Sequence, residues 1–563
     1  MSQIYRPDVT RRRFVKGVVG VSALASLSPY SKMAWATPST SELSGTEFDL
    51  EVAPLPVNFT GTDSTATAVN GLVPGPILRV REGDTVAIRV TNRLHEMTTI
   101  HWHGIILDAG MDGVPGISFP GIEPGETFVH RFKLVQSGTY WYHAHTLHEQ
   151  TGSYGALIVE PADASNEPRV DRDYPVMLSD WTDENPVDVY LNLKKMGGYY
   201  NYQRLTAGDF LDDMKLLGMG TAISKRRIWN RTRMSQTDFS DVSAATYTYL
   251  MNGTSPAGNW TGLAKKGERV RLRFIGAGTA TYFDVRIPGL KLTVISTDGQ
   301  RVEPVVVDEF RIGPGETYDV LVDIPDDDAY TIFAQSMDRS GYARGTLSPK
   351  VGVEAALPAL DSPALLEPVD MMGAMAQGGA MGGMTRTMSR KRPNHARTEY
   401  GPGVDMRVDN PRVNLDDPGP GLRDNGRRVL TYADLKSVEG VTDPRAPSRD
   451  IELHLTGNME RFIWSIDGLK LNEAKPLHFP KGERVRVILH NDSTMAHPMH
   501  LHGMWSELES PDGQFQVRKH TVSVQPAQSV SMLVTADAEG RWAFHCHLLY
   551  HMAAGMFREV VVA

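Results

Sequence analysis

The sequence repeats one β unit three times, and this repeat constrains the fold more than any other feature. Each copy begins with a turn glycine and a strand of alternating apolar and polar residues: REGDTVAIRVTN (81–92), KKGERVRLRFIG (265–276) and PKGERVRVILHN (480–491). Each continues with a Pro-containing turn and another strand: IEPGETFVHRFKL (122–134), RIGPGETYDVLVD (311–323) and SVQPAQSVSMLVT (523–535). Three copies predict an all-β protein of three homologous domains, which we expect to be Greek-key β-sandwiches.

The composition agrees with this organisation. The chain has 563 residues, too many for one core, and its 52 Gly and 35 Pro favour a turn-rich β protein. We place the three domains at 45–165, 170–350 and 431–563, with a Met-, Gly- and Pro-rich linker at 351–430. The net charge of −9 argues against a nucleic-acid partner.

The N-terminus has the features of a Tat export signal, which we place at residues 1–36. Arg11-Arg12-Arg13 precedes a short apolar run, and Ala34-Trp35-Ala36 offers a small-residue cleavage site. A membrane anchor is the alternative, but the run is much shorter than the ~20 residues that a span needs. We therefore expect a periplasmic protein without a membrane span.

The repeat also aligns the histidines. Eighteen and twenty residues beyond the equivalent turn residues (Gly83 and Gly125 in the first copy, Gly482 and Ala527 in the third), the first and third copies carry His-x-His pairs, whereas the middle copy carries apolar or neutral residues. The pairs are His101 and His103, His143 and His145, His500 and His502, and His545 and His547. The corresponding residues of the middle copy are Val285, Ile287, Phe333 and Gln335.

The geometry of a β-strand explains how these pairs could bind metal ions. Residues i and i+2 of a strand face the same side, so each pair directs two imidazoles one way. Eight imidazoles exceed the four ligands of a zinc ion and suit a cluster of three metals. A structural zinc site or chance placement explains this pattern poorly.

Cys546 is the only cysteine and lies between two of these histidines. An exported chain with one cysteine forms no internal disulfide, so the thiol is unpaired, reactive or a metal ligand. Its side chain faces away from its neighbours, where it can meet His497 and His551, with Met556 as a weak fourth ligand. Two His, one Cys and a distant Met are typical of a blue-copper site.

The remaining eight histidines have no such pattern, and we interpret them as ordinary core or surface residues. They are His95, His130, His148, His395, His454, His478, His490 and His520. Of these, His148 and His395 are the two that we consider for contact with transient copper.

The motifs HWHG (101–104), HAH (143–145), HPMHLHG (497–503) and HCHLLYHMAAGM (545–556) resemble the four copper motifs of multicopper oxidases. The closest resemblance is to the CopA-type copper-resistance oxidases of the bacterial periplasm. The stretches SDWTDENP (179–186) and TYLMNGTSPAGNWTGL (248–263) look like that subfamily. The resemblance implies cupredoxin-like domains and four copper ions: one type 1, one type 2 and two type 3.

The resemblance also implies which residue binds which copper. His497, Cys546, His551 and Met556 would bind type 1 copper, and His101 and His500 would bind type 2 copper. His103, His143 and His547 would bind one type 3 copper, and His145, His502 and His545 would bind the other.

The implied reaction passes single electrons from a reductant, at an exposed edge of His497 or His551, through Cys546 to the cluster, where O2 becomes water. Asp112 matches an acidic residue that family members place near type 2 copper, and we predict that it assists proton delivery, although an aspartate before glycine is also an ordinary turn residue. Some members carry a carboxylate four residues beyond the cysteine, where this chain has Tyr550.

The reductant is suggested by a methionine-rich tract, MMGAMAQGGAMGGMTRTM (371–388). Thioethers favour Cu(I), so we expect copper recruitment there, although a linker with incidental methionines is the alternative. Its methionines are Met371, Met372, Met375, Met381, Met384 and Met388. Asp492 and Met495, just before His497, are candidate outer ligands for substrate copper.

The sequence therefore favours an oxidase of Cu(I), with phenols as further substrates. A copper-sequestering protein that relies on the tract is the alternative, and a nitrite reductase fits poorly because eight imidazoles exceed the need of a single type 2 copper. We expect a monomer that receives copper from a periplasmic carrier.

Overall fold

Each copy of the repeat folds into two neighbouring antiparallel strands. In the first copy β5 (Thr85–Asn92) pairs with β7 (Thr127–Lys133). The other copies form the same pairs, which are β13 (Arg269–Gly276) with β18 (Thr317–Asp323) and β24 (Arg484–Asp492) with β29 (Ser529–Thr535). The prediction that the three segments are structurally equivalent is therefore confirmed.

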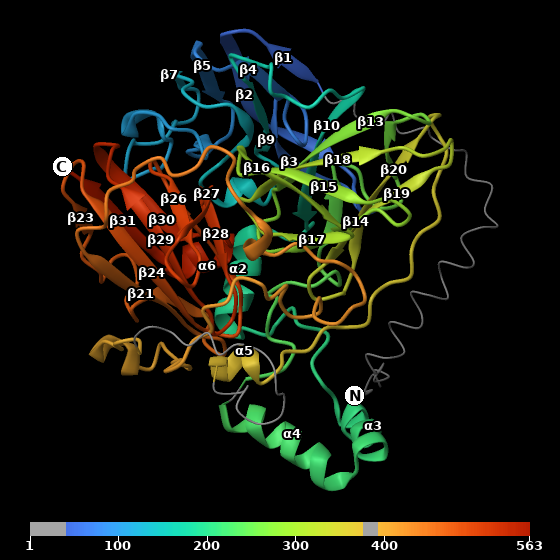
Figure 1. Cartoon of the computed structure of the whole chain (residues 1–563), viewed down its shortest axis with the longest axis vertical. Helices are drawn as coiled ribbons and strands as arrows, with labels where there is room; N and C mark the ends of the chain where they lie inside the picture. The colour runs from blue at the N-terminus through green and yellow to red at the C-terminus, as the bar shows by residue number, and fades with distance from the viewer. Residues whose placement is uncertain (1–40, 233, 375–391) are drawn as a thin grey trace, which may run out of the picture. The chain divides into compact units, whose positions relative to one another are not determined.

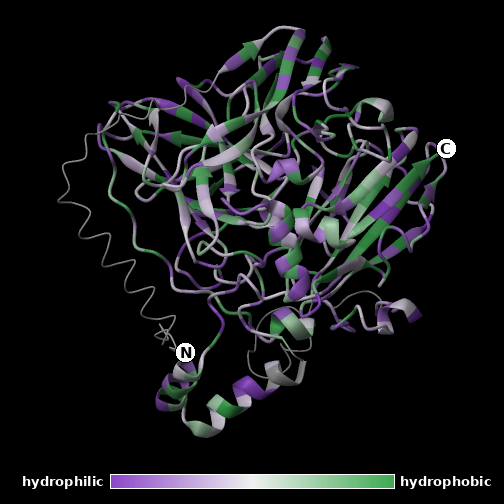
Figure 2. Ribbon diagram, turned by 180° about the vertical axis from the view of Figure 1, so that it is seen from behind, coloured by the Kyte–Doolittle hydropathy of each residue, from purple (hydrophilic) through white to green (hydrophobic). Residues whose placement is uncertain are grey.

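The structure is a computed structural model that describes residues 41–232, 234–374 and 392–563. The predicted export signal lies outside the described residues. Along the strands, hydrophobic and hydrophilic residues alternate, as Figure 2 shows. The hydrophobic face of each sheet packs against a second sheet, and the domain core lies between the two.

The first domain, blue in Figure 1, is a sandwich of two sheets with strand orders β1-β4-β9-β8-β6 and β3-β2-β5-β7. Two short 3₁₀ helices, η2 (Ala109–Met111) and η3 (Leu147–Glu149), follow strands that carry histidines. The strands not yet given are β1 (Glu42–Ser44), β2 (Glu47–Val57), β3 (Ser64–Val69), β4 (Ile77–Arg81), β6 (His101–His103), β8 (Gly138–His143) and β9 (Tyr154–Glu160).

The second domain has strand orders β11-β10-β13-β18-β15-β16 and β12-β20-β19-β14-β17. Its further strands are β10 (Arg172–Trp181), β11 (Thr248–Met251), β12 (Trp260–Leu263), β14 (Phe283–Arg286), β15 (Leu292–Thr297), β16 (Gln300–Val307), β17 (Glu309–Ile312), β19 (Tyr330–Ser336) and β20 (Tyr342–Ser348).

Three helices interrupt the second domain between its first two strands, and the repeat gave no sign of them. They are α2 (Pro186–Lys195), α3 (Ala207–Leu217) and α4 (Met219–Thr232), and the last two project from the domain in Figure 1. Capping residues stabilise the first turns of α2 and α3. The Asn185 side chain accepts a hydrogen bond from the Val187 N–H, and Thr206 forms a capping box with Asp209.

The third domain, red in Figure 1, has strand orders β22-β21-β24-β29-β26-β27 and β23-β31-β30-β25-β28. The short helix α6 (Leu549–Ala554) follows β30. Its other elements are η6 (Tyr432–Asp434), β21 (Asp450–Asn458), β22 (Ile463–Ile466), β23 (Leu477–Phe479), β25 (His497–Leu501), β26 (Ser506–Glu509), β27 (Phe515–Lys519), β28 (Thr521–Val524), β30 (Gly540–Cys546) and β31 (Phe557–Val562).

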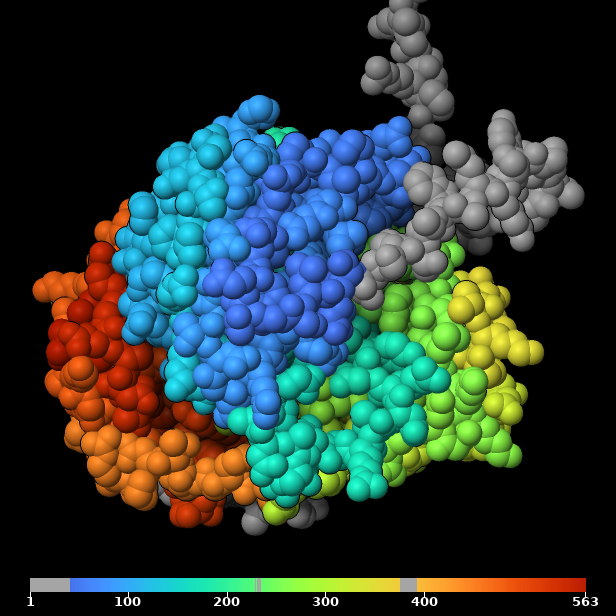
Figure 3. All heavy atoms as spheres, turned by 90° about the horizontal axis from the view of Figure 1, so that it is seen from above, coloured from blue at the N-terminus to red at the C-terminus, as the bar shows by residue number. Residues whose placement is uncertain are grey.

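The described parts of the predicted linker pack against the domains instead of standing free. They include the helix α5 (Val369–Met372) and the 3₁₀ helix η5 (Arg397–Tyr400), and Leu366, Met406 and Leu415 are buried. Figure 3 shows the first domain in contact with both of the others. The all-β class with three cupredoxin-like sandwiches is confirmed, while the boundaries between domains stay predictions.

Candidate metal centres

Strand pairing brings the His-x-His pairs face to face. β6 and β8 are antiparallel neighbours in which His101 is opposite His143, and β25 and β30 are antiparallel neighbours in which His500 is opposite His545. The equivalent strands of the second domain place Val285 opposite Ala334. The middle domain thus keeps the strand pair without the ligands, as the repeat predicts.

The eight imidazoles converge across the interface of the first and third domains. His145, His502 and His545 form one group whose ligand atoms all lie within 4.8 Å, and the Nε2 atom of His545 is 3.1 Å from that of His145. The same His545 Nε2 is 3.0 Å from the Nε2 of His502. This is the group that the resemblance implied for one copper.

Two further groups complete the cluster, and each has ligand atoms within 4.8 Å of one another. One contains His101, His103 and His143, and the other contains His101, His500 and His502. The ring of His547 completes the set, because its centroid is 4.8 Å from that of His103 and 5.0 Å from that of His143. All eight predicted cluster histidines therefore share one buried site.

The nitrogen atoms of the cluster fit a set of metal ions. Several are buried and have no hydrogen-bond partner, among them the Nε2 atoms of His101, His143 and His500. Burial lowers the pKa of His143 and His500 well below the usual value, so their imidazoles are neutral at pH 7 and keep a free lone pair. Unpartnered buried nitrogens cost free energy that copper coordination would offset.

Asp112 orients two of the cluster imidazoles from different domains. Its backbone carbonyl accepts a hydrogen bond from His101 Nδ1 at 2.7 Å, and its Oδ2 is 2.9 Å from His502 Nδ1. A donor at Nδ1 leaves Nε2 free to bind a metal, so Asp112 fixes the tautomer of both rings. The position of the predicted acid beside the cluster is thus supported by geometry.

Glu149 was not predicted and orients a third ring. Its Oε2 is 3.0 Å from His143 Nδ1, and its side chain is almost fully buried. Burial raises the pKa of this carboxyl well above its usual value, and the nearby Asp180 adds to the shift. The signal in the sequence was slight, because HTLHEQ resembles any polar loop after a strand.

A second, smaller centre lies on the other face of β30. Cys546 Sγ is 3.5 Å from His497 Nδ1 and 3.8 Å from His551 Nδ1, and these two nitrogens are 3.2 Å apart. Met556 is fully buried, and its carbonyl accepts a hydrogen bond from the Cys546 N–H at 3.1 Å. Burial raises the pKa of the Cys546 thiol, so its thiolate needs a cation such as a metal ion beside it.

The expectation of an exposed imidazole edge at this centre is wrong. His497 and His551 are both 0% exposed. The Nε2 atom of His497 is 2.7 Å from the Ser493 hydroxyl, and that of His551 is 2.9 Å from Oδ2 of Asp241 in the second domain. The wall that Ser493 and Asp241 form therefore separates the imidazoles from solvent.

His520 is a ninth imidazole of the cluster region, although its sequence suggested an ordinary histidine. It forms a group with His103 and His500, with ligand atoms within 4.8 Å. Its carbonyl accepts a hydrogen bond from His500 Nδ1 at 2.7 Å, and its own N–H donates to Asp298 of the second domain. A lone histidine without an i+2 partner gave no signal of this role.

The candidates for substrate copper are dispersed. Met371 and Met495 are buried in the hydrophobic core, and Met372 is 39% exposed. Asp492 is 0% exposed and its Oδ2 is 2.7 Å from Nδ1 of His454. The burial of Asp492 and Met495 gives no support to their expected contact with incoming copper. The other methionines of the tract, Met375, Met381, Met384 and Met388, lie outside the described residues.

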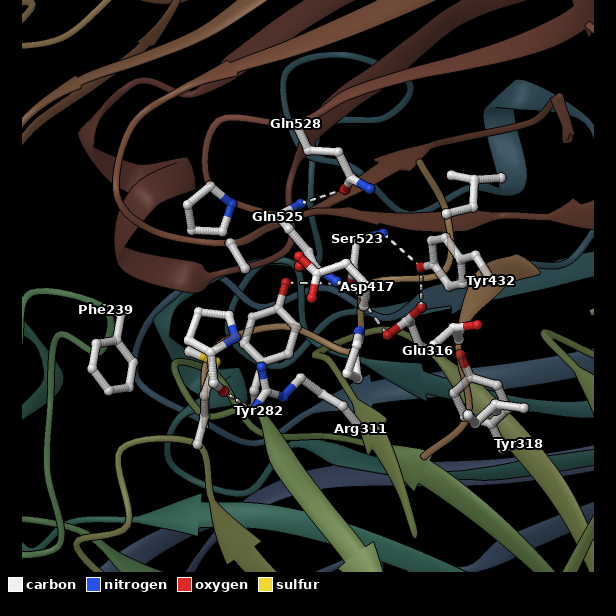
Figure 4. A pocket seen from close by; sticks show the side chains of 18 residues that line it. Phe239, Tyr282, Arg311, Glu316, Tyr318, Asp417, Tyr432, Ser523, Gln525 and Gln528 are labelled. Atoms are coloured by element: carbon white, nitrogen blue, oxygen red, sulfur yellow. Dashed lines mark hydrogen bonds between the residues drawn. The ribbon is translucent and has the colours of Figure 1, made fainter. Parts of the chain in front are cut away.

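Residues of the second domain, the third domain and the segment between them line a pocket (Figure 4). Glu316 lies in it and accepts hydrogen bonds from the hydroxyls of Tyr432 at 2.6 Å and Ser523 at 3.2 Å. The preceding residue, Gly315, borders His547 and His103 of the cluster. The second domain thus contributes a polar wall to a cluster for which it supplies no histidine.

Comparison with known proteins agrees with this geometry. Three profiles described as multicopper oxidase match residues 51–164, 223–350 and 444–563. The chain is 52% identical to a copper resistance protein A homolog of Pseudomonas syringae pv. tomato, over 98% of this chain and 99% of that protein. It is 50% identical to copper resistance protein A of Escherichia coli, with the same coverage of 98% and 99%.

Solved structures share the fold. A laccase from Botrytis aclada matches with a TM-score of 0.63 at 21% identity, covering 93% of this chain and 88% of that chain. Fet3p, a multicopper oxidase that functions in iron import, matches with a TM-score of 0.64 at 20% identity, covering 92% of this chain and 90% of that chain. Among the described residues, no helix is both long and apolar enough to cross a bilayer. With its three matching domains, its paired histidines and its buried thiol, the chain belongs to the multicopper oxidase family.

Proposed function

We propose that the protein is an oxidase of copper resistance, which couples the one-electron oxidation of Cu(I) to the reduction of O2 to water. The observation that best supports oxidase activity is the arrangement around Cys546. Its side chain contacts His497 and His551. Its neighbours in the chain, His545 and His547, belong to the eight-imidazole cluster. The identity of 52% with a copper resistance protein A homolog supports the physiological role.

The ligand sets that we propose are those implied by the family resemblance, and the group of His145, His502 and His545 supports one of them. We assign type 1 copper to His497, Cys546, His551 and Met556, and type 2 copper to His101 and His500. We assign one type 3 copper to His103, His143 and His547, and the other to His145, His502 and His545. Copper at these positions would supply the one-electron redox change that the reaction needs.

The chain itself supplies connection and orientation. Cys546 is covalently joined through the backbone to His545 and His547, so the two centres are linked by one short stretch of β30. Asp112 holds His101 and His502 in one tautomer, and its carboxylate, like that of Glu149, lies beside the cluster where proton delivery would need an acid. Storage of copper alone requires neither this link nor this orientation.

The substrate assignment rests on the methionine tract at 371–388. Six thioethers within 18 residues form a soft donor set, and soft donors favour Cu(I) over Cu(II). Phenols are the second substrate class that we propose, because the family includes laccases such as that of Botrytis aclada. The three consecutive arginines at 11–13, which include the twin-arginine signature, support export by the Tat pathway to the periplasm.

The test is O2 uptake driven by Cu(I) in the copper-loaded protein. One variant replaces Met375, Met381, Met384 and Met388 with leucine, which removes the thioethers and keeps the length of the tract. We expect its KM for Cu(I) to rise while its oxidation of a phenol is unchanged, because the tract binds substrate copper and takes no part in the reaction.

The control variant replaces the exposed Met196 and Met219, which lie outside the tract, with leucine. It should behave as the unaltered protein in both assays. A protein that bound Cu(I) but consumed no O2 would be a sequestering protein, and this result would overturn the proposal.

A further inference from the structure

A second cluster of histidines and carboxylates lies in the third domain, apart from the two centres described above. It contains His395, Glu399, His454 and Asp492, and the most exposed of these side chains is only 5% exposed. His454 comes from β21 and Asp492 from the end of β24, whereas Glu399 lies in η5 and His395 just before it. Two strands and one separate segment therefore meet at this point.

One atom of each side chain points to a common centre. Oε2 of Glu399 is 2.7 Å from Nδ1 of His395 and 3.3 Å from Nδ1 of His454. Oδ2 of Asp492 is 2.7 Å from Nδ1 of His454 and 3.6 Å from Nδ1 of His395. In a tetrahedral site with bonds of about 2.0–2.2 Å, ligand atoms lie about 3.3–3.6 Å apart. The two longer separations lie in this range, whereas the two of 2.7 Å are hydrogen bonds that would lengthen when a metal ion binds.

The other oxygen of each carboxylate is already occupied by a backbone donor. Oε1 of Glu399 accepts a hydrogen bond from the Ala396 N–H at 2.7 Å, and Oδ1 of Asp492 accepts one from the Val408 N–H at 2.8 Å. These bonds turn Oε2 and Oδ2 toward the imidazoles. Ligating carboxylates in metal sites are typically held by outer hydrogen bonds of this kind.

The charge of the cluster favours a cation. Among the described residues, no lysine or arginine forms an ion pair with Glu399 or Asp492, while a further carboxylate, Asp467, accepts a hydrogen bond from the His454 N–H. The outer nitrogens of the two rings, Nε2 of His395 and Nε2 of His454, are buried without a hydrogen-bond partner. In the part of the chain that the structure describes, the imidazoles of His395 and His454 are the basic side chains that face these two buried carboxylates, whose burial carries a desolvation cost.

We propose that His395, Glu399, His454 and Asp492 form a fifth metal site, for a divalent ion of the zinc or copper(II) class. Two imidazoles and two carboxylates suit these ions, whereas Cu(I) prefers thiolates and thioethers, and Mg²⁺ and Ca²⁺ prefer oxygen alone. The bound ion would tie the segment 392–400 to β21 and β24. This site uses none of the residues assigned to the four family coppers.

The test titrates Zn(II) into the full-length protein after it has been loaded with its four coppers and freed of loosely bound metal. Calorimetry and metal analysis should find one zinc ion in addition to the coppers. Glu399→Gln and His395→Gln each remove one ligand from the outer segment, and we expect each to weaken zinc binding by at least about tenfold, because even changes outside the ligand shell cost that much.

The control is His478→Gln, which changes an exposed histidine of the same domain and should leave zinc binding unchanged. The blue absorption of every variant should equal that of the unaltered protein, which shows that the fold and copper loading persist. Hydrogen exchange in residues 392–400 should slow when zinc is added to the unaltered protein and should not change in Glu399→Gln.

A parallel titration uses Cu(II), which should add one spin-resonance signal of nitrogen and oxygen coordination that zinc suppresses. The proposal is supported if either ion binds to the unaltered protein and binds more weakly to Glu399→Gln. If neither ion binds beyond the four coppers, or if the variants bind as tightly as the control, the cluster is a hydrogen-bonded network and the proposal is overturned. Because zinc is redox inert, this result is independent of any oxidase activity.

Discussion

At the scale of single residues, several imidazoles of the cluster are held through Nδ1, which leaves Nε2 free for a metal ion. Asp112, Glu149 and the carbonyl of His520 each contact an Nδ1 atom of a cluster histidine. Such contacts set the tautomer and direction of a ring before any metal binds. Their removal should therefore affect the cluster while leaving the centre at Cys546 intact.

Asp112→Asn tests this at one position. The amide lacks the negative charge that faces His101 and His502, so we expect a loss of about 10–100-fold in copper affinity of the cluster or in O2 reduction. Copper content and O2 uptake measure the loss, and the blue absorption should persist. The matched control is Asp108→Asn, four residues earlier, where the exposed side chain makes no capping hydrogen bond. Equal effects of the two changes would contradict the orienting role of Asp112.

The residues of the site that could be predicted are those whose chemistry repeats in the sequence. The four His-x-His pairs were recognisable because two copies of the repeat carry them at equal distances from equivalent turn residues. Glu149 and His520 were not, because their contacts arise from tertiary packing and no periodicity marks them. Burial of His497 and His551 was also missed, since the residue that screens His551 is Asp241, 310 residues away in another domain.

At the scale of elements, the turn between β17 and β18 is where the domain without ligands reaches the cluster. Gly315 has φ +85°, and a Cβ atom there would lie 2.8 Å from Cδ2 of His547 and 3.1 Å from Cε1 of His103. The equivalent turn of the first domain contains Gly125 with φ +80° and open space around it. The equivalent residue of the third domain is Ala527.

The comparison of Gly315→Ala with Gly125→Ala isolates this contact. Both changes strain a left-handed backbone by about 1–2 kcal/mol. The contact with His547 adds a steric cost to Gly315→Ala alone, so it should lower stability more than Gly125→Ala. Only Gly315→Ala should displace His547 and reduce both the copper content of the cluster and O2 uptake. Metal analysis beside thermal unfolding separates the two effects. Full cluster copper in Gly315→Ala would show that the turn does not constrain the cluster.

The strands of the repeat were predictable because period-two alternation marks them directly. The helices α2, α3 and α4 were not predicted, since they are an insertion with no counterpart in the other two copies. The packing of the described part of 351–430 was also missed, because its composition is typical of a linker while its buried Leu366, Met406 and Leu415 are widely spaced.

At the scale of the whole molecule, a buried cation joins the second and third domains behind the cluster. Lys519 is 0% exposed, and its Nζ is 3.1 Å from Oδ2 of Asp298 and 3.3 Å from Oε1 of Glu316. It also donates a hydrogen bond to the Thr297 hydroxyl at 2.8 Å. The lysine belongs to the third domain and its three partners belong to the second. These contacts therefore couple the folding of the two domains.

Lys519→Met should destabilise the protein by about 3–5 kcal/mol, because it leaves two carboxylates buried without their cation. The double variant Lys519→Met with Asp298→Asn should recover part of this loss. Arg541→Met is the control: Arg541 forms an ion pair with Glu559, its side chain is 53% exposed, and its loss should cost below about 1 kcal/mol. Denaturant unfolding measures all three, and a cost for Lys519→Met as small as that of the control would refute the coupling.

The account as a whole depends on β30, in which alternate side chains belong to two different metal centres. The most direct measurement is copper content together with visible absorption and O2 uptake in Cys546→Ser. We predict that this variant loses one copper in four, all of its blue absorption and all O2 reduction driven by Cu(I), while the copper held by the eight histidines remains. Persistent blue absorption, or loss of the cluster copper along with it, would contradict the account.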